Sequence, residues 1–263
     1  MLRTAVLATV NETRKNVLVI MSYRFNLLAE LLTLFFVYTG VMFMIGDGKF
    51  DPVRMAPTLL GYLVWYYALI AIGNMSYGLA EETQTGTLEQ MYMSPAPTGM
   101  LLLGRSLATF IWSTGQILLL GLIIVVLLNI QIPLRAEGLV PFAFTMIGLF
   151  GFGFMIGGAT LVFKHVQALS NLIQNLLLFL NGSILPVDKF PHWLELIARA
   201  LPSTQGIIVL RNVVLNGQSL SDTWADGSLP FLVIHSLVYF VGGLLIFKYC
   251  EGIARRRGSL GQY

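Results

Sequence analysis

Four amide side chains recur at helical spacing in the fifth apolar stretch of the chain. Gln167, Asn171, Gln174 and Asn181 occupy positions i, i+4, i+7 and i+14, so one face of a helix would carry all four. Amides without partners are costly in hydrocarbon, so this stripe should face protein or a wet cavity. Two interpretations stay open: the stripe lines a transport pathway, or it makes ordinary interhelical hydrogen bonds worth about 0.6 kcal/mol each.

A second polar face lies on an earlier apolar stretch. Tyr62, Tyr66 and Tyr77 share one helical face there, with Asn74 nearby. Aromatic residues near the ends of a span are typical of the membrane interface belt. The alternative is that these tyrosines and Asn74 form a wall that contacts a transported substrate.

Other chemistry finds little support in the residues. His165, His192 and His235 are scattered over separate segments, so we expect neither a metal cluster nor a catalytic triad. Cys250 is the only cysteine, which excludes an internal disulfide. A phosphate-binding loop needs G-x-x-x-x-G-K-[ST], and the chain contains no such motif. Energy for any transport must therefore come from a partner or from an ion gradient.

The amino-acid composition indicates that the chain lies in a lipid membrane. The chain has 263 residues, of which 56% are hydrophobic and 11% are charged, whereas soluble domains carry roughly 25% charged residues. The net charge of +3 is small, and the basic residues do not cluster, so a nucleic-acid partner is not expected. The sequence predicts an all-α integral membrane protein in contact with membrane lipid.

Six apolar stretches could each cross a bilayer, and the fifth is the shortest and most polar. They are 26–45, 58–77, 106–130, 139–163, 169–185 and 229–249. No soluble domain fits between them, so residues 1–263 form a single predicted transmembrane domain. An even number of spans puts both ends on one side, and the excess of Lys and Arg, including the three arginines at 255–257, makes that side cytoplasmic.

Two segments outside the spans also have helical patterns. Residues 1–22 carry apolar side chains on one face and polar ones on the other, which predicts an interfacial helix on the cytoplasmic leaflet or a helix packed on protein. Residues 186–228 are long and half apolar, and Pro186 and Pro202 interrupt them. They predict two short helices that re-enter the outer leaflet, where protein would have to cover their backbone.

The segment "AEETQTGTLEQMYMSPAP", residues 80–97, would form the first cytoplasmic loop. We expect Glu81 and Glu82 near the start of a short helix, where its dipole favours carboxylates. Leu88 and two neighbours spaced at i+3 and i+4 give it a small apolar face, and two prolines end it. Three carboxylates and no Lys or Arg disfavour anionic lipid headgroups, so the segment predicts a protein partner.

This loop resembles the first cytoplasmic loop of ABC-2-type ABC exporter permeases, in which an acidic pair precedes G-T-L-E-Q and a proline-bearing exit. A second stretch, "LNGSILPVDKFPHWLELIARALPSTQGIIVLRNVVLNG", is similar to the final external segment of that family. The matching residues there are Pro186, Pro191, Trp193, Pro202, Arg211 and Gly217.

The resemblance implies a permease of the plasma (inner) membrane that exports drugs, lipids or glycolipids. Two copies of the chain would form the pathway, with the amide stripe, Tyr62, Tyr66 and Asn74 along it. The loop would carry a coupling helix that docks on a separate nucleotide-binding ATPase, which would hold ATP and Mg; this chain would hold no cofactor. The docking residues would be Glu81, Glu82, Thr85, Gly86, Thr87, Leu88 and Glu89.

Two other classes of protein compete with this interpretation. A self-contained secondary transporter or channel would need an ion site in the membrane and, commonly, inverted halves, and the sequence shows neither acids at mid-membrane nor paired broken helices. A membrane enzyme acting on lipid would need convergent acid, base or metal groups. Copurification with an ATPase subunit separates the three.

Overall fold

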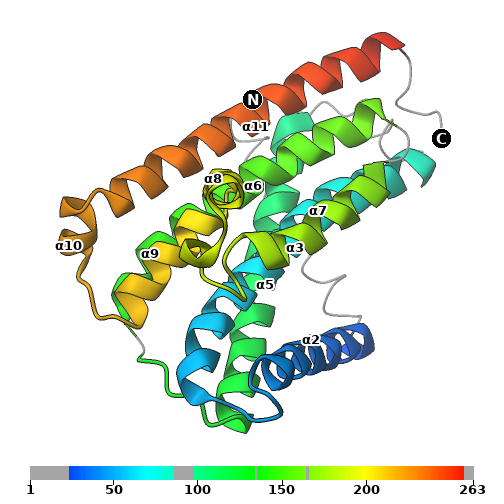
Figure 1. The fold of residues 1–263 in the computed structure, drawn as a ribbon. Helices are drawn as coiled ribbons and strands as arrows, with labels where there is room; N and C mark the ends of the chain where they lie inside the picture. The colour runs from blue at the N-terminus through cyan, green and yellow to red at the C-terminus, as the bar shows by residue number, and fades with distance from the viewer. Residues whose placement is uncertain (1–23, 86–97, 134, 164–165, 258–263) are drawn as a thin grey trace.

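The computed structural model describes residues 24–85, 98–133, 135–163 and 166–257, and all regular secondary structure in these ranges is helical (Figure 1). The long elements are α2 (Arg24–Ile45), α3 (Pro52–Thr85), α5 (Thr98–Leu127), α6 (Leu139–Val162), α7 (Val166–Leu180) and α11 (Ser228–Arg257). Within the described residues, five of them, all except α7, are long and apolar enough to cross a membrane. The prediction of an all-helical membrane protein is confirmed, but the count of six spans is not.

The difference lies in the fifth predicted span, 169–185. It coincides with α7, which has 15 residues and a length of roughly 22 Å, whereas the hydrocarbon core is roughly 30 Å thick. The helix ends because the Asn181 side chain accepts a hydrogen bond from the backbone N–H of Ser183 (2.9 Å), a local bond that competes with helix continuation. Gly182 then adopts a positive φ of 82°.

Successive long helices alternate in direction. α2, α5 and α7 run one way, and α3, α6 and α11 run the other, because residue numbers that rise along one helix fall along its antiparallel neighbour. Three sets of contacts fix these directions relative to α3. On α2, Glu30 meets Tyr66 and Leu34 meets Tyr62. On α5, Gly121 meets Leu63 and Phe110 meets Tyr67, and on α7, Ser170 meets Ser76 and Gln174 meets Trp65.

α6 and α11 are parallel and lie side by side along their length (Figure 1). Glycines bring their backbones together: a Cβ on Gly151 would lie 2.3 Å from the carbonyl oxygen of Tyr239, and one on Gly243 would lie 1.9 Å from that of Gly151. Close packing through small residues is the usual way in which helices associate in lipid, where burial in hydrocarbon gives no hydrophobic drive. α6 is similarly close to α3, where Gly153 approaches the carbonyl oxygen of Ala71.

α3 is the central helix, and α2 (blue in Figure 1) and α11 lie on opposite sides of the bundle. The middle of α3 is buried, including Tyr62, Tyr66 and Tyr67, each at most 2% exposed. The outward faces of the peripheral helices instead carry large exposed apolar side chains, as expected for surfaces that contact lipid. Examples are Phe36 and Phe43 on α2, Leu118, Leu122 and Val126 on α5, and Ile234, Val238, Val241 and Leu245 on α11.

α3 also corrects the prediction that a new helix starts near Glu81. The helix has 34 residues, a length of roughly 51 Å, and it continues through the predicted span 58–77 to Thr85. Glu81 and Glu82 therefore lie in its last turns, near the C-terminal end, where the dipole does not favour carboxylates. The sequence 79–85 offers no helix breaker, and Thr85 itself donates to the carbonyl oxygen of Glu81 (2.9 Å), so the helix runs on.

Residues 186–228 form three short α-helices, where we expected two. They are α8 (His192–Ala200), α9 (Thr204–Val214) and α10 (Leu220–Ala225), preceded by the 3-10 turn η2 (Val187–Lys189). Prolines lie at the boundaries, with Pro186 before η2, Pro191 before α8 and Pro202 between α8 and α9. The helix that the sequence did not predict, α10, begins with a capping box formed by Ser219 and Asp222.

Candidate translocation pathway and coupling segment

Polar contacts join α3 to α7 along most of α7. The Trp65 indole N–H donates to the backbone oxygen of Gln174 (2.7 Å), and the Ser170 hydroxyl donates to that of Ser76 (2.8 Å). Tyr77 and Asn171 also form a hydrogen bond. α7 is therefore held against α3 by groups that would otherwise lack partners in hydrocarbon.

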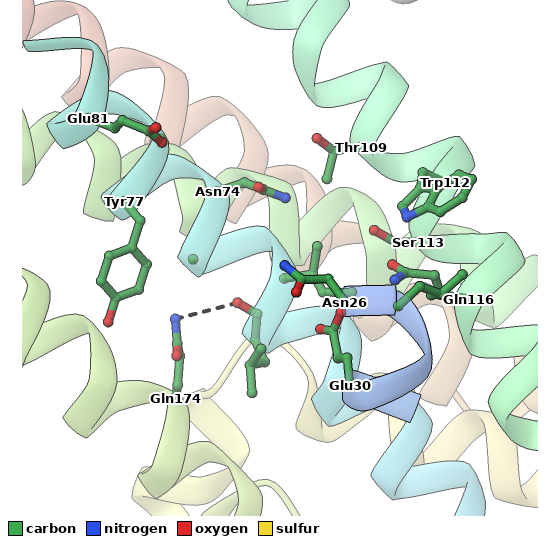
Figure 2. A pocket seen from close by; sticks show the side chains of 15 residues that line it. Asn26, Glu30, Asn74, Tyr77, Glu81, Thr109, Trp112, Ser113, Gln116 and Gln174 are labelled. Carbon is green, nitrogen blue, oxygen red and sulfur yellow. Dashed lines mark hydrogen bonds between the residues drawn. The ribbon is translucent and has the colours of Figure 1, made fainter. Parts of the chain in front are cut away.

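A cavity of about 530 Å³ lies beside the contact between α3 and α7, and α2, α3 and α5 supply most of its lining (Figure 2). Its volume is within the range of small-molecule sites. Leu27, Leu69 and Ile70 contribute apolar surface to it. Its polar and aromatic lining consists of Asn26 and Glu30 from α2, Asn74, Tyr77 and Glu81 from α3, Thr109, Trp112, Ser113 and Gln116 from α5, and Gln174 from α7.

The structure distributes the predicted pathway residues over three environments. Asn74 and Gln174 line the cavity. Tyr62 and Tyr66 are buried in the core, where their hydroxyls donate to the carbonyl oxygen of Leu34 and to the carboxylate of Glu30, both at 3.0 Å.

The other three members of the amide stripe lie outside the cavity. Asn171 is exposed beside Tyr77, and Gln167 is half-buried. Asn181 is fully buried and donates to the Ser203 hydroxyl (3.2 Å). Gln167, Asn171 and Gln174 lie on α7, but the end of α7 at Leu180 separates Asn181 from them.

The lining residues on α5 were not predicted from the sequence, although a signal was present. Thr109, Trp112, Ser113 and Gln116 are spaced i, i+3, i+4 and i+7 within an otherwise apolar stretch, which is the pattern of one polar helical face. Glu81 was assigned only to the coupling segment, yet it also lines the cavity. The cavity therefore reaches the end of α3 from which the coupling segment continues.

Beyond Leu180, the non-helical stretch 181–185 passes close to α3 at Gly61. The Ser183 hydroxyl donates to the carbonyl oxygen of Gly61 (2.8 Å). A Cβ on Gly61 would lie 2.6 Å from the Cα of Ser183. Irregular backbone at membrane depth is tolerated only where protein buries it, and Asn181 and Ser183 are fully buried.

Arg211 of α9 also contacts the place where the stretch 181–185 meets α3, which is called the Gly61 junction below. Its guanidinium donates to the backbone oxygens of Pro57 and Ser183, both at 2.9 Å, and so links α3, the stretch 181–185 and α9. Burial lowers the pKa of Arg211 to about 10, and the carboxylate of Asp188 acts in the opposite direction. Among the other predicted external residues, Pro202 is buried, whereas Pro186, Pro191 and Trp193 are exposed.

The predicted coupling residues are only partly within the described structure. Glu81 and Thr85 are exposed on the last turns of α3, and Glu82 is half-buried. Gly86, Thr87, Leu88 and Glu89 lie outside the described residues. α3 therefore contains the first residues of the predicted coupling segment 80–97.

Comparisons with known proteins agree with the membrane architecture. The sequence profile of the ABC-2 type transporter family matches residues 5–215. The protein described as "Probable multidrug ABC transporter permease YbhR" is 28% identical over 189 residues, in Escherichia coli K12 and in Escherichia coli O157:H7. Each alignment covers 68% of this chain and 48% of the relative, so the chain spans about half the length of the curated relatives that it matches. Because the family profile covers most of the chain and five apolar helices can cross a bilayer, this multi-pass membrane protein belongs to the ABC-2 type transporter family.

Proposed function

We propose that the chain is the membrane-spanning permease subunit of an ATP-driven exporter. Family membership over residues 5–215 carries this proposal, and the cavity between α2, α3 and α5 supplies a place for a small molecule. A separate ATPase subunit, with ATP and Mg, would dock on residues 80–97. The substrate would be an amphiphilic drug, lipid or glycolipid, and the multidrug description of the relatives favours the first of these.

The membrane would be the plasma (inner) membrane, with the segments before α2 and after α11 on the cytoplasmic side. Alternating helix directions support only the placement of both ends on the same side, because three helices run each way. α7 and the non-helical stretch 181–185 would together make the sixth crossing, although α7 is too short to do so alone. Residues 186–228 would then be external, and α8 and α9 would partly enter the outer leaflet.

The docking proposal predicts that the chain copurifies with a nucleotide-binding ATPase. The permease would be tagged at its C-terminus, expressed in its native host, and extracted in mild detergent. We expect an ATPase subunit to elute with it and to hydrolyse ATP. Elution of the permease with no nucleotide-binding protein, together with transport driven by an ion gradient, would favour a secondary transporter instead.

The exposed face of α7 supports a homodimer. Asn171 and Asn175 are exposed there beside Leu172 and Leu176. Asn171 already accepts a hydrogen bond from Tyr77, but the other donors and acceptors of these two amides would lack partners on a lipid-facing surface. We therefore propose that a second copy covers this face and that the pathway lies between the copies.

This dimer predicts crosslinking through α7. Single cysteines at position 171 or 175, on a Cys250→Ser background, should crosslink two subunits through a bifunctional maleimide. A cysteine at position 238, on the lipid-facing surface of α11, is the matched control and should not crosslink. Free reaction of positions 171 and 175 with a lipid-dissolved thiol probe, without crosslinks, would contradict the dimer.

A further inference from the structure

The charge of the cavity between α2, α3 and α5 indicates what it binds. Two carboxylates line it, Glu30 from α2 and Glu81 from α3 (Figure 2). Among the side chains that the structure describes, which do not include those of Arg24 and Arg105, no Lys, Arg or His lines it and neither carboxylate forms a salt bridge. Glu30 accepts a hydrogen bond from the Tyr66 hydroxyl, which is a neutral donor and so leaves the negative charge of Glu30 uncompensated.

Such a cavity discriminates between ligands by charge. Glu30 and Glu81 are both exposed, so their charges act on a ligand in the cavity through attraction and repulsion. An anionic ligand would be repelled by these carboxylates, whereas a cation would be attracted to the nearer of them.

The remaining lining favours an organic cation over a metal ion. Leu27, Leu69 and Ile70 give apolar surface, and the ring of Trp112 offers a face of the kind that attracts organic cations. Among the described residues, no group of three or more metal-binding side chains gathers here or elsewhere. The lining is thus suited to an apolar body that carries a positive charge.

A buried hydroxyl beside the cavity has no hydrogen-bond partner within the described part of the chain. Ser113 is 1% exposed, and its hydroxyl has no hydrogen-bond partner among the described residues. Figure 2 shows this hydroxyl between Thr109 and Gln116, on the side of α5 that faces Asn74 across the cavity. Buried polar groups are normally satisfied, and a polar group on a ligand would satisfy this one.

We propose that the cavity binds amphiphilic organic cations and that Glu30 and Glu81 select them by charge. This inference deepens the proposed function, since it names the substrate class of the exporter. The two carboxylates come from different helices, so the selectivity belongs to the assembled bundle and not to one segment.

The test compares two probes of matched size and opposite charge, tetraphenylphosphonium and tetraphenylborate. Their binding to the full-length chain would be measured in nanodiscs of zwitterionic phosphatidylcholine. We expect the phosphonium to bind at least tenfold more tightly than the borate. Equal binding of the two probes, tighter binding of the borate, or binding of neither overturns the proposal without any variant being needed.

Substitutions then assign the selectivity to residues. Glu30→Gln and Glu81→Gln should each weaken phosphonium binding roughly tenfold, and the double variant should lose the preference for the cation. Glu137→Gln removes an exposed carboxylate that does not line the cavity, so it should leave the affinity unchanged and controls for net charge. Tyr66→Phe keeps the Glu30 charge and should retain the preference.

These results stand apart from the exporter proposal. Copurification with an ATPase tests the function, and probe binding tests the substrate class. A chain that recruits an ATPase but prefers the borate, or binds neither probe, refutes only the inference. A chain that binds the phosphonium but recruits no ATPase refutes the function instead. Gln variants that retain full phosphonium affinity refute the role of the two carboxylates.

Discussion

The double substitution Glu82→Lys and Leu88→Asp is expected to abolish ATP-driven transport while leaving the membrane helices intact. The first change reverses a charge in the proposed coupling segment 80–97, and the second puts a carboxylate on the apolar face predicted for that segment. Burial of a leucine contributes about 1.5–3 kcal/mol, and a charge placed in an apolar contact costs more. Together they should weaken ATPase docking by roughly a hundredfold or more.

The fold should tolerate both changes, which makes the loss informative. Glu82 lies near the C-terminal end of α3, where a lysine interacts better with the helix dipole than a glutamate does. The measurements are ATPase copurification, ATP hydrolysis stimulated by substrate, and the melting temperature of the purified permease. Glu251→Gln, which removes a carboxylate of the exposed pair with Arg255 on α11, is the control and should dock normally. Normal docking and transport by the double variant would refute the assignment of residues 80–97.

Replacement of Gly61 by alanine is expected to destabilise the whole bundle. The added Cβ would lie 2.6 Å from the Cα of Ser183, 2.9 Å from its carbonyl oxygen and 2.9 Å from Nη2 of Arg211. Two of these neighbours are backbone atoms, which cannot rotate away. Overpacking typically costs 1–3 kcal/mol, and displacement of Arg211 would also weaken its two hydrogen bonds.

We therefore expect a loss of roughly 3 kcal/mol, which corresponds to a melting temperature lower by about 6–12 °C. Gly78→Ala is the matched control for stability, because Gly78 lies on the same helix and a Cβ there would meet nothing within 4 Å. The control should keep its melting temperature or gain slightly, since alanine favours helix more than glycine does. Equal melting temperatures for the two variants would show that the Gly61 junction does not hold the bundle together.

Much of the architecture could be predicted from the sequence because lipid constrains each helix separately. A helix in hydrocarbon satisfies its own backbone, so apolar length alone located α2, α6 and α11 with boundaries close to the predicted ones, apart from the C-terminal extension of α11. The polar loop 80–97 and the prolines of 186–228 were also local signals. Both segments resemble those of the ABC-2 family in sequence, and this resemblance does not depend on contacts between helices.

Local signals failed where a distant partner decides the backbone. α7 has the composition of a span, but it ends at Leu180, and the chain beyond it is stabilised by Gly61, 122 positions from Ser183, and by Arg211. The start of a helix at Glu81 was wrong for a different and local reason, because residues 79–85 contain no breaker that would end α3.

The sequence by itself thus determined that this protein is helical, lies in a membrane and presents polar residues along particular helix faces. Only the tertiary structure decided what each polar face meets: Gln174 and Asn74 line a cavity, Asn181 is buried against Ser203, and Glu30 and Glu81 line the same cavity from different helices. The reason is geometric. Periodicity fixes which side chains share a face, but the neighbour that covers the face depends on helix contacts between residues far apart in the chain, and these set where water, lipid or ligand can reach.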